Sequence, residues 1–444
     1  MPSLLQKLWS RQVLYVPLLA IALILMMVRR VVMAHVFSPE EFAAFSAGLL
    51  IASAFLMIGV LGLYPLLQRE LPSYFATGRE QAGRILLAQN ILVALVLLLP
   101  FAAIALLVGP YVKLTPWEAI ISAANGLSQQ LFLTATVESR SRLNPLRFSL
   151  ENLVRAVGVV LLSVAVAMIT HSAAATLLIE AIVTGIGSFL IMRPFVQVAK
   201  YKWSHSYILA ARHVTSIDWR TSRALLLVSA LSFLILSADS WFAASLLSQS
   251  AFAAYAFIAT VGTSAQSIQS ILNASLFPSL AHSMAKVGLF ATFRLALVAI
   301  VITLFLGGFA AVPMFYILRT LISEYFSAYG ETITILPIAL AVSVIRVSDF
   351  WSSYLIVIKK EKLIISADIS GFLTGFALWL FVVVLPSGIS KIGLLQVAWL
   401  ALFLALASPL CKFFFSLWAT KSWKVGTRQD ILSRMKAGYD RLGL

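Results

Sequence analysis

The sequence has little cysteine and little charge, and both shortages restrict what the protein can be. Cys411 is the only cysteine, so a disulfide framework and any paired-cysteine metal or redox site are excluded. Charged residues make up 11% of the 444 residues, whereas about a quarter of a soluble protein is charged. The sequence also lacks a phosphate-binding loop, an HExxH motif and a nucleophile elbow. We therefore expect neither an ATP-driven machine nor an enzyme, and no bound cofactor.

Long apolar runs are abundant instead, since 61% of the residues are hydrophobic. A helix needs about 20 apolar residues to cross the hydrocarbon core of a bilayer. The sequence predicts an all-α polytopic membrane protein with about twelve such helices. The expected spans are 13–36, 42–67, 85–108, 117–137, 148–170, 173–192, 224–247, 252–276, 291–316, 332–358, 363–385 and 392–420.

Basic residues are distributed unevenly between alternate loops. Of 33 lysines and arginines, only Lys113, Arg319 and Lys391 fall in loops on one side of the predicted membrane. Cytoplasmic loops collect basic residues, so both termini are predicted to be cytoplasmic. The formal net charge of +16 then reflects this asymmetry, and no nucleic-acid partner is expected.

The two halves of the chain share short matching segments. EFAAFSAG from Glu41 resembles AFAAYAFI from Ala251, and LYP ending at Pro65 resembles LFP ending at Pro278. The offsets of these matches agree to within a few residues, which indicates two parallel six-helix repeats related by an axis along the membrane normal. The predicted organisation is a bundle at 1–192, a cytoplasmic linker at 193–223, a second bundle at 224–420 and a basic tail at 421–444. The tail is predicted as an amphipathic helix on the inner leaflet, with a disordered tail as the alternative.

Ionisable residues inside the apolar runs are the candidate functional groups. An arginine or aspartate at the centre of a spanning helix costs about 2.5–3.5 kcal/mol to insert, so such residues face a cavity or a partner. The predicted substrate-binding cations are Arg29, Arg30, Arg155 and Arg346. The acids predicted to couple an ion or to pair with these cations are Asp239, Asp349, Glu180, Glu151 and Asp368.

Local ion pairing is the alternative for several of these groups. Glu151 and Arg155 are spaced i,i+4, and Arg346 and Asp349 are spaced i,i+3, so each pair has the spacing of an intrahelical bridge.

Arg29 and Arg30 have no acid within a turn of their own helix, which favours a cavity-facing position for at least one of them. Asp239 lies at the position equivalent to Arg29 in the second repeat. An alternative role for Arg29 is therefore a pair with Asp239 across the two halves.

Three stretches resemble a known family. These are AHVFSPEEFAAFSAG, LFPSLAHSMAKVG and VIRVSDFWSSYLIVIKKEKL, which are similar to the polysaccharide and oligosaccharide-lipid flippases related to MATE transporters. Ser38 and Ala44 stand where that family's LGPEEFG turn has glycines. The resemblance implies a V-shaped pair of six-helix bundles in the bacterial inner membrane, around a central cavity that opens alternately to each side.

The resemblance also implies a function. The substrate would be an undecaprenyl-diphosphate-linked oligosaccharide for O-antigen, capsule or exopolysaccharide assembly, and a proton or Na⁺ would be the coupling ion. Membrane lipids and a polysaccharide polymerase or other assembly protein would be the partners. The alternative with the same fold is a MATE-type cation-coupled multidrug exporter, which would present acids and aromatic residues to cationic drugs.

Overall fold

The protein is entirely helical over the residues that the computed structural model describes, which are 14–142, 144–197, 203–388 and 392–421. The first half contains α2 (Tyr15–Val36), α3 (Pro39–Ile58), α4 (Leu63–Ala76), α5 (Glu80–Val108), α6 (Pro116–Ser141), α7 (Pro145–Thr170) and α8 (Ala173–Gln197). The second half contains α10 (Trp219–Leu246), α11 (Gln249–Lys286), α12 (Leu289–Tyr325), α13 (Thr332–Val347), α14 (Trp351–Val357), α15 (Glu361–Trp379) and α17 (Leu394–Lys421). The predicted linker contains α9 (Trp203–Arg212), which packs on α5.

Ten described helical segments are long and apolar enough to cross a membrane. Two further helices lie among them: α6, with 26 residues, and α11, with 38 residues. At 1.5 Å per residue both are long enough to span the hydrocarbon core. α6 is less apolar because it buries polar side chains such as Asn125, Gln130 and Glu138 inside the first half. With these two, the described residues contain twelve helical segments of membrane-spanning length, the number that the sequence predicts for a multi-pass membrane protein.

The two halves repeat one packing scheme, which confirms the predicted parallel repeats. α3 packs on α6 as α11 packs on α13, α6 on α8 as α13 on α17, and α7 on α8 as α15 on α17. The second helix of each half also begins in the same way. Ser38 accepts a hydrogen bond from the backbone N–H of Glu41, and Ser248 accepts one from that of Ala251. Such caps satisfy amide groups that the first turn of a helix leaves without partners.

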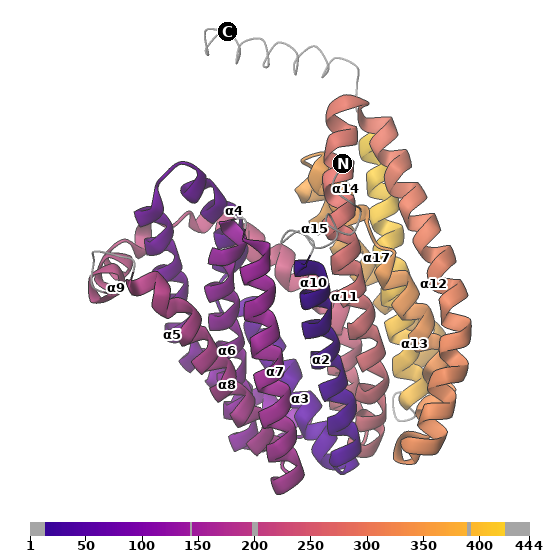
Figure 1. Ribbon diagram of the computed structural model, residues 1–444. Coiled ribbons are helices and arrows are strands. Elements are labelled where there is room, and N and C mark those ends of the chain that lie inside the picture. Colours follow the sequence, from indigo (N-terminus) through magenta and orange to yellow (C-terminus); the bar gives the residue numbers. More distant parts are fainter. Residues whose placement is uncertain (1–13, 143, 198–202, 389–391, 422–444) are drawn as a thin grey trace, which may run out of the picture.

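The halves form the predicted V (Figure 1). They meet along α2 and α3 of the first half and α10 and α11 of the second. We call the end of the bundle with the turns at 77–79 and 358–360 and the C-terminal end of α6 the basic end, and the opposite end the far end. The far end is closed by contacts between the halves: the Tyr329 hydroxyl donates to the Ala34 carbonyl (3.0 Å), and Phe42 packs edge-on against Tyr329. Lys113 donates to the Leu247 carbonyl at the same end.

Two spans that the sequence predicted as continuous are broken. The first, 42–67, breaks between α3 and α4, because Leu61 and Gly62 adopt left-handed backbone conformations. Gly62 allows α10 to approach closely, and the Ser222 hydroxyl donates to the Leu61 carbonyl there (2.6 Å). The second, 332–358, breaks between α13 and α14, where the Asp349 carbonyl accepts a hydrogen bond from Gln269 (2.9 Å). Both breaks are stabilised by neighbouring helices, which the local sequence does not reveal.

Candidate functional site: a cavity between the two halves

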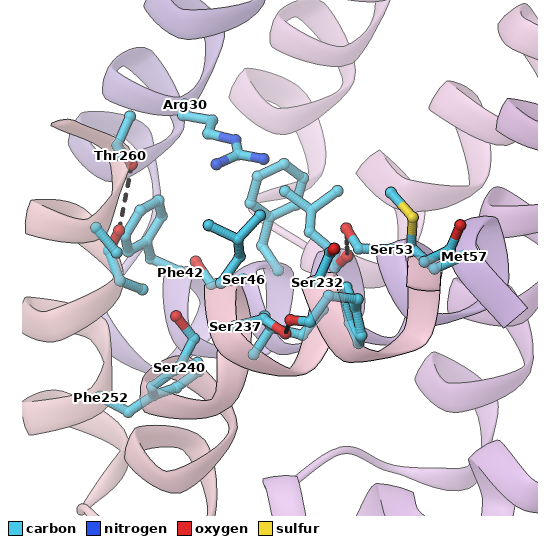
Figure 2. Close-up of a pocket in the computed structure, with 18 of the residues that line it drawn as sticks. Arg30, Phe42, Ser46, Ser53, Met57, Ser232, Ser237, Ser240, Phe252 and Thr260 are labelled. Carbon is cyan, nitrogen blue, oxygen red and sulfur yellow. Dashed lines mark hydrogen bonds between the residues drawn. The ribbon is translucent and has the colours of Figure 1, made fainter. Parts of the chain in front are cut away.

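A cavity of about 420 Å³ lies between the halves, and we call it the interlobe cavity. Its walls come from α2 and α3 on one side and from α10 and α11 on the other. Figure 2 shows Arg30 on one side of this space and Ser232, Ser237 and Ser240 across from it. The cavity thus lies at the junction that a rocking movement of the two halves would change.

Hydroxyl groups supply most of the polarity of the interlobe cavity. The lining includes Ser46, Ser53, Ser229, Ser232, Ser237, Ser240 and Thr260, between aromatic and aliphatic side chains. Ser53 and Ser237 donate to carbonyls of their own helices, as serines in apolar helices commonly do. Ser229, Ser232 and Ser240 recur at helical spacing, so they share one face of α10. This serine stripe is visible in the sequence and was not predicted to line a site.

Arg30 is the one charged residue among the described residues that line the interlobe cavity. Its neighbour Arg29 points elsewhere, because successive helical residues are about 100° apart around the axis. Arg29 is 4% exposed and its Nη1 lies 2.5 Å from Oε1 of Glu180 on α8. Arg29 also lies over the Phe45 ring, 5.7 Å from its centroid. The two arginines therefore have different surroundings: one faces the interlobe cavity and one is paired inside the first half.

Basic charge is in excess in this part of the first half. Arg155 on α7 is close enough to Arg29 and Glu180 to interact with both electrostatically, and so is Arg30. Three guanidinium groups therefore interact with the carboxylate of Glu180, and that of Arg29 forms an ion pair with it. The environment is positive and sheltered from water, and an anion would be stabilised in it.

The second half pairs its charges internally. Asp239 on α10 lies 3.4 Å from Arg346 on α13, and the Tyr255 hydroxyl donates to the same carboxylate (2.6 Å). These groups line a cavity of about 60 Å³ within the second half. Tyr255 was not among the predicted residues, although it belongs to the repeated segment after the second cap. Asp239 and Arg346 thus form a structural pair with little free space around it.

A second buried cluster centres on Lys412 of α17. Its ammonium group lies 2.9 Å from Asp349, beside the break before α14, and 3.1 Å from Asp368 on α15. Ser408 contacts Asp368 at 3.4 Å. The sequence analysis did not single out Lys412, although a lysine inside an apolar run meets the same criterion as the predicted arginines.

The ion pairs of the structure decide between the alternatives for the two predicted intrahelical bridges. Neither predicted intrahelical bridge forms: Glu151 pairs instead with Arg147 (2.8 Å), Arg346 with Asp239, and Asp349 with Lys412. Glu151 therefore forms its i,i+4 bridge with Arg147 of the preceding turn of α7, whereas Arg346 and Asp349 find their partners on other helices.

The pair predicted across the halves is also absent, because Arg29 pairs with Glu180 and Asp239 with Arg346. The predicted basic tail lies outside the described residues. Within them, no group of three histidine, cysteine or acidic residues is arranged to hold a metal ion.

The chain resembles known transporters in structure and not in sequence. No protein-family model matches it, and no curated protein matches it. An inward-facing MATE-family multidrug resistance transporter of the MOP superfamily aligns with a TM-score of 0.65 at 10% identity, over 89% of this chain and 94% of its own. The lipid II flippase MurJ, in an inward closed conformation, aligns with a TM-score of 0.62 at 12% identity, over 93% and 88%. A variant of a MATE transporter from Vibrio cholerae aligns with a TM-score of 0.57 at 15% identity, over 94% and 98%.

These similarities establish the fold. The chain has the all-α, two-lobed architecture of MOP-superfamily transporters, as the sequence resemblance implied. Its neighbours are transporters and a flippase rather than enzymes. The substrate is a separate question, which depends on the residues of this chain.

Proposed function

We propose that the protein is a flippase for a lipid-linked oligosaccharide carried on a polyprenyl diphosphate such as undecaprenyl diphosphate. The observation that carries this proposal is the lining of the interlobe cavity: one arginine, a set of hydroxyls and no carboxylate among the described residues. Arg30 would bind the diphosphate or an acidic sugar, and the serines would hydrogen-bond sugar hydroxyls. The product would serve O-antigen, capsule or exopolysaccharide assembly.

The chemistry of the cavity favours this substrate over a cationic drug. A diphosphate must cross about 30 Å of hydrocarbon, and a sheltered arginine lowers the cost through charge-assisted hydrogen bonds. A cationic drug would be repelled by Arg30, and the buried acids Glu180, Asp239 and Asp349 already have an arginine or lysine partner. The multidrug exporter is therefore the weaker alternative.

Orientation follows from the basic end. Because basic loops stay in the cytoplasm, we assign the basic end to the cytoplasmic side of a bacterial inner membrane, with both termini inside. The closed far end then gives an inward-facing state, in which substrate enters from the cytoplasmic leaflet. Alternating access would require the contacts of Tyr329 and Lys113 at the far end to separate.

Coupling and partners complete the proposal. Asp349 and Asp368 share one ammonium group, so this cluster carries one more negative charge than positive and is the strongest candidate to take up a proton or Na⁺. Glu180, Glu151 and Asp239 have arginine partners, and we assign them to charge pairing. A polysaccharide polymerase would receive the product on the other side of the membrane.

The test is export of surface polysaccharide in cells that depend on this gene. Arg30→Ala is expected to abolish surface polysaccharide and to accumulate the lipid-linked intermediate inside, whereas Arg30→Lys keeps part of the flux if charge alone suffices. Arg319→Ala, at an exposed arginine near the far end, is the matched control and should export normally. Normal export by Arg30→Ala at wild-type protein level would contradict the proposal.

A further inference from the structure

A second, larger cavity lies within the first half, between α7 and α8. It has a volume of about 920 Å³, and we call it the α7–α8 groove. Its walls are mainly aliphatic, and Phe132 of α6 contributes to its lining. Val154 is 71% exposed, and Ile186 and Leu190 are each more than half exposed, so the groove is open along its side. Exposed aliphatic walls at this depth suit a hydrocarbon chain better than water or a sugar.

Arg155 adds a cationic group to the otherwise mainly aliphatic α7–α8 groove. It lines the groove, and its guanidinium lies over the Phe132 ring at 4.6 Å from the centroid. Its Nε is buried without a hydrogen-bond acceptor, and among the described residues no carboxylate lies within ion-pair distance of it. A buried N–H group without an acceptor is costly unless an acceptor arrives from outside the chain.

The depth of Arg155 also points to an amphiphilic ligand. It is the eleventh residue of α7, which begins at Pro145, so it lies about 15 Å along the helix from the basic end. Arg147, nearer that end, already pairs with Glu138 and Glu151. A ligand that satisfies both the aliphatic walls and Arg155 has a hydrocarbon chain next to a phosphate.

The same region connects electrostatically to the interlobe cavity. Arg155 and Arg30 each interact with the Arg29–Glu180 pair, from the groove and from the interlobe cavity respectively. A phosphate on Arg155 would therefore lie in the same positive region as one on Arg30.

We infer that the α7–α8 groove binds the lipid part of the transported substrate, with the polyprenyl chain along the aliphatic walls and a phosphate on Arg155. This inference rests on the proposed function, because it commits the groove to the polyprenyl carrier rather than to a bulk phospholipid. One substrate would then occupy two binding sites, with its lipid in the α7–α8 groove and its saccharide head in the interlobe cavity.

The chain supplies a matched control for this assignment. Gly187 lines the α7–α8 groove, and a Cβ added there meets open space, so Gly187→Leu fills the groove without a clash. Gly308 has equally open space in a groove of about 470 Å³ between α12 and α13, which contains no charged residue. Gly308→Leu therefore makes the same change in an apolar groove without an arginine.

The experiment measures retention of undecaprenyl phosphate, and of phosphatidylglycerol as competitor, by the purified full-length protein using native mass spectrometry. The wild type should retain undecaprenyl phosphate in preference to phosphatidylglycerol. Gly187→Leu and Arg155→Gln should each weaken retention about tenfold, as expected for loss of a charge-assisted contact or of the space it needs. Gly308→Leu should retain the lipid like the wild type, and thermal stability confirms that all variants are folded.

Equal retention in the Gly187, Arg155 and Gly308 variants would overturn the inference, as would equal retention of both lipids. The outcome is separable from the test of the proposed function. If the groove variants bind normally while Arg30→Ala still blocks export, the groove assignment fails and the flippase proposal stands. If Arg30→Ala exports normally while the groove variants lose the lipid, the flippase proposal fails and the structure has a polyprenyl phosphate site.

Discussion

The first and second halves of the protein pack the same pairs of helices, yet they arrange their buried charges in opposite ways. In the first half Arg29, Arg30 and Arg155 all interact electrostatically with one carboxylate, that of Glu180. In the second half Asp239, Asp349 and Asp368 face two cations, Arg346 and Lys412. Even the equivalent positions are reversed, because Arg29 on α2 corresponds to Asp239 on α10.

This difference gives the two halves different electrostatic environments. Buried basic groups outnumber acidic ones around Glu180 in the first half, which suits an anionic ligand. The three carboxylates of the second half each lie beside a cation of the same half, Arg346 or Lys412, which leaves them suited to hold helices together or to titrate. The comparison therefore predicts that removing a buried cation destabilises the second half much more than the first.

The largest effect is expected at Lys412. Lys412→Met leaves Asp349 and Asp368 buried without their shared cation, which should cost about 3–5 kcal/mol of stability. The measurement is thermal unfolding of the purified protein in detergent. Adding Asp349→Asn and Asp368→Asn to Lys412→Met should restore much of the loss, and an unchanged melting temperature for Lys412→Met would refute the cluster's structural role.

The joint between the halves should be the next most sensitive place. A Cβ at Gly62 would lie 2.1 Å from the Ser222 carbonyl oxygen of α10, and Gly62 has a φ of +78°. Gly62→Ala should therefore cost about 1–3 kcal/mol from backbone strain and the forced shift of α10. Gly78 has a similar φ of +72° but open space around its Cβ, so Gly78→Ala isolates the backbone part. Equal losses of stability for both variants would show that a Cβ at Gly62 does not clash with α10.

A smaller effect is expected at the far-end contact of Lys113. Lys113→Met removes its hydrogen bond to the Leu247 carbonyl, which should destabilise the closed far end by about 1 kcal/mol. Spin labels at Trp117 and Ser250, on a Cys411→Ser background, would report the distance between the halves at this end. We expect a larger fraction of long distances in Lys113→Met, and an identical distribution would contradict the assigned contact.

The smallest effect on stability is expected at Arg155, although it is as charged as Lys412. Arg155→Met removes a cation without a carboxylate partner and loses one ring contact, so the change in stability should stay within about 1 kcal/mol. Thermal unfolding beside the same substitution at Lys412 gives the direct comparison. A loss as large as that of Lys412→Met would mean that Arg155 is a structural cation and that the two halves do not differ as described.

Much of the fold was predictable because it depends on features local to the sequence. Apolar length gives the number of spans, the basic loops give their alternation, and the matches around Glu41 and Ala251 reveal the repeat. The breaks after α3 and α13 were missed, since they depend on Gly62 meeting α10 and on Gln269 meeting Asp349. These contacts join residues that are 160 and 80 positions apart, respectively.

The sequence predicts which charged residues belong to the candidate site, but not which of them pair with one another. The cost of inserting a charge into the membrane identifies Arg29, Arg30 and Arg155 as residues that need a partner or a cavity. It does not tell which arginine pairs with an acid and which faces a cavity. The rotation of about 100° between Arg29 and Arg30 places one against Glu180 and the other in the interlobe cavity. Lys412 met the same criterion and was overlooked.

The most direct test of the central claim is translocation in proteoliposomes that contain only the purified protein. A fluorescent undecaprenyl-diphosphate disaccharide on the inner leaflet becomes accessible to an external quencher when it is flipped. The account predicts rapid exposure with the wild type and with Arg319→Ala, partial exposure with Arg30→Lys, and background rates with Arg30→Ala. Wild-type rates for Arg30→Ala, or no exposure with the wild type under any imposed proton or Na⁺ gradient, would contradict it.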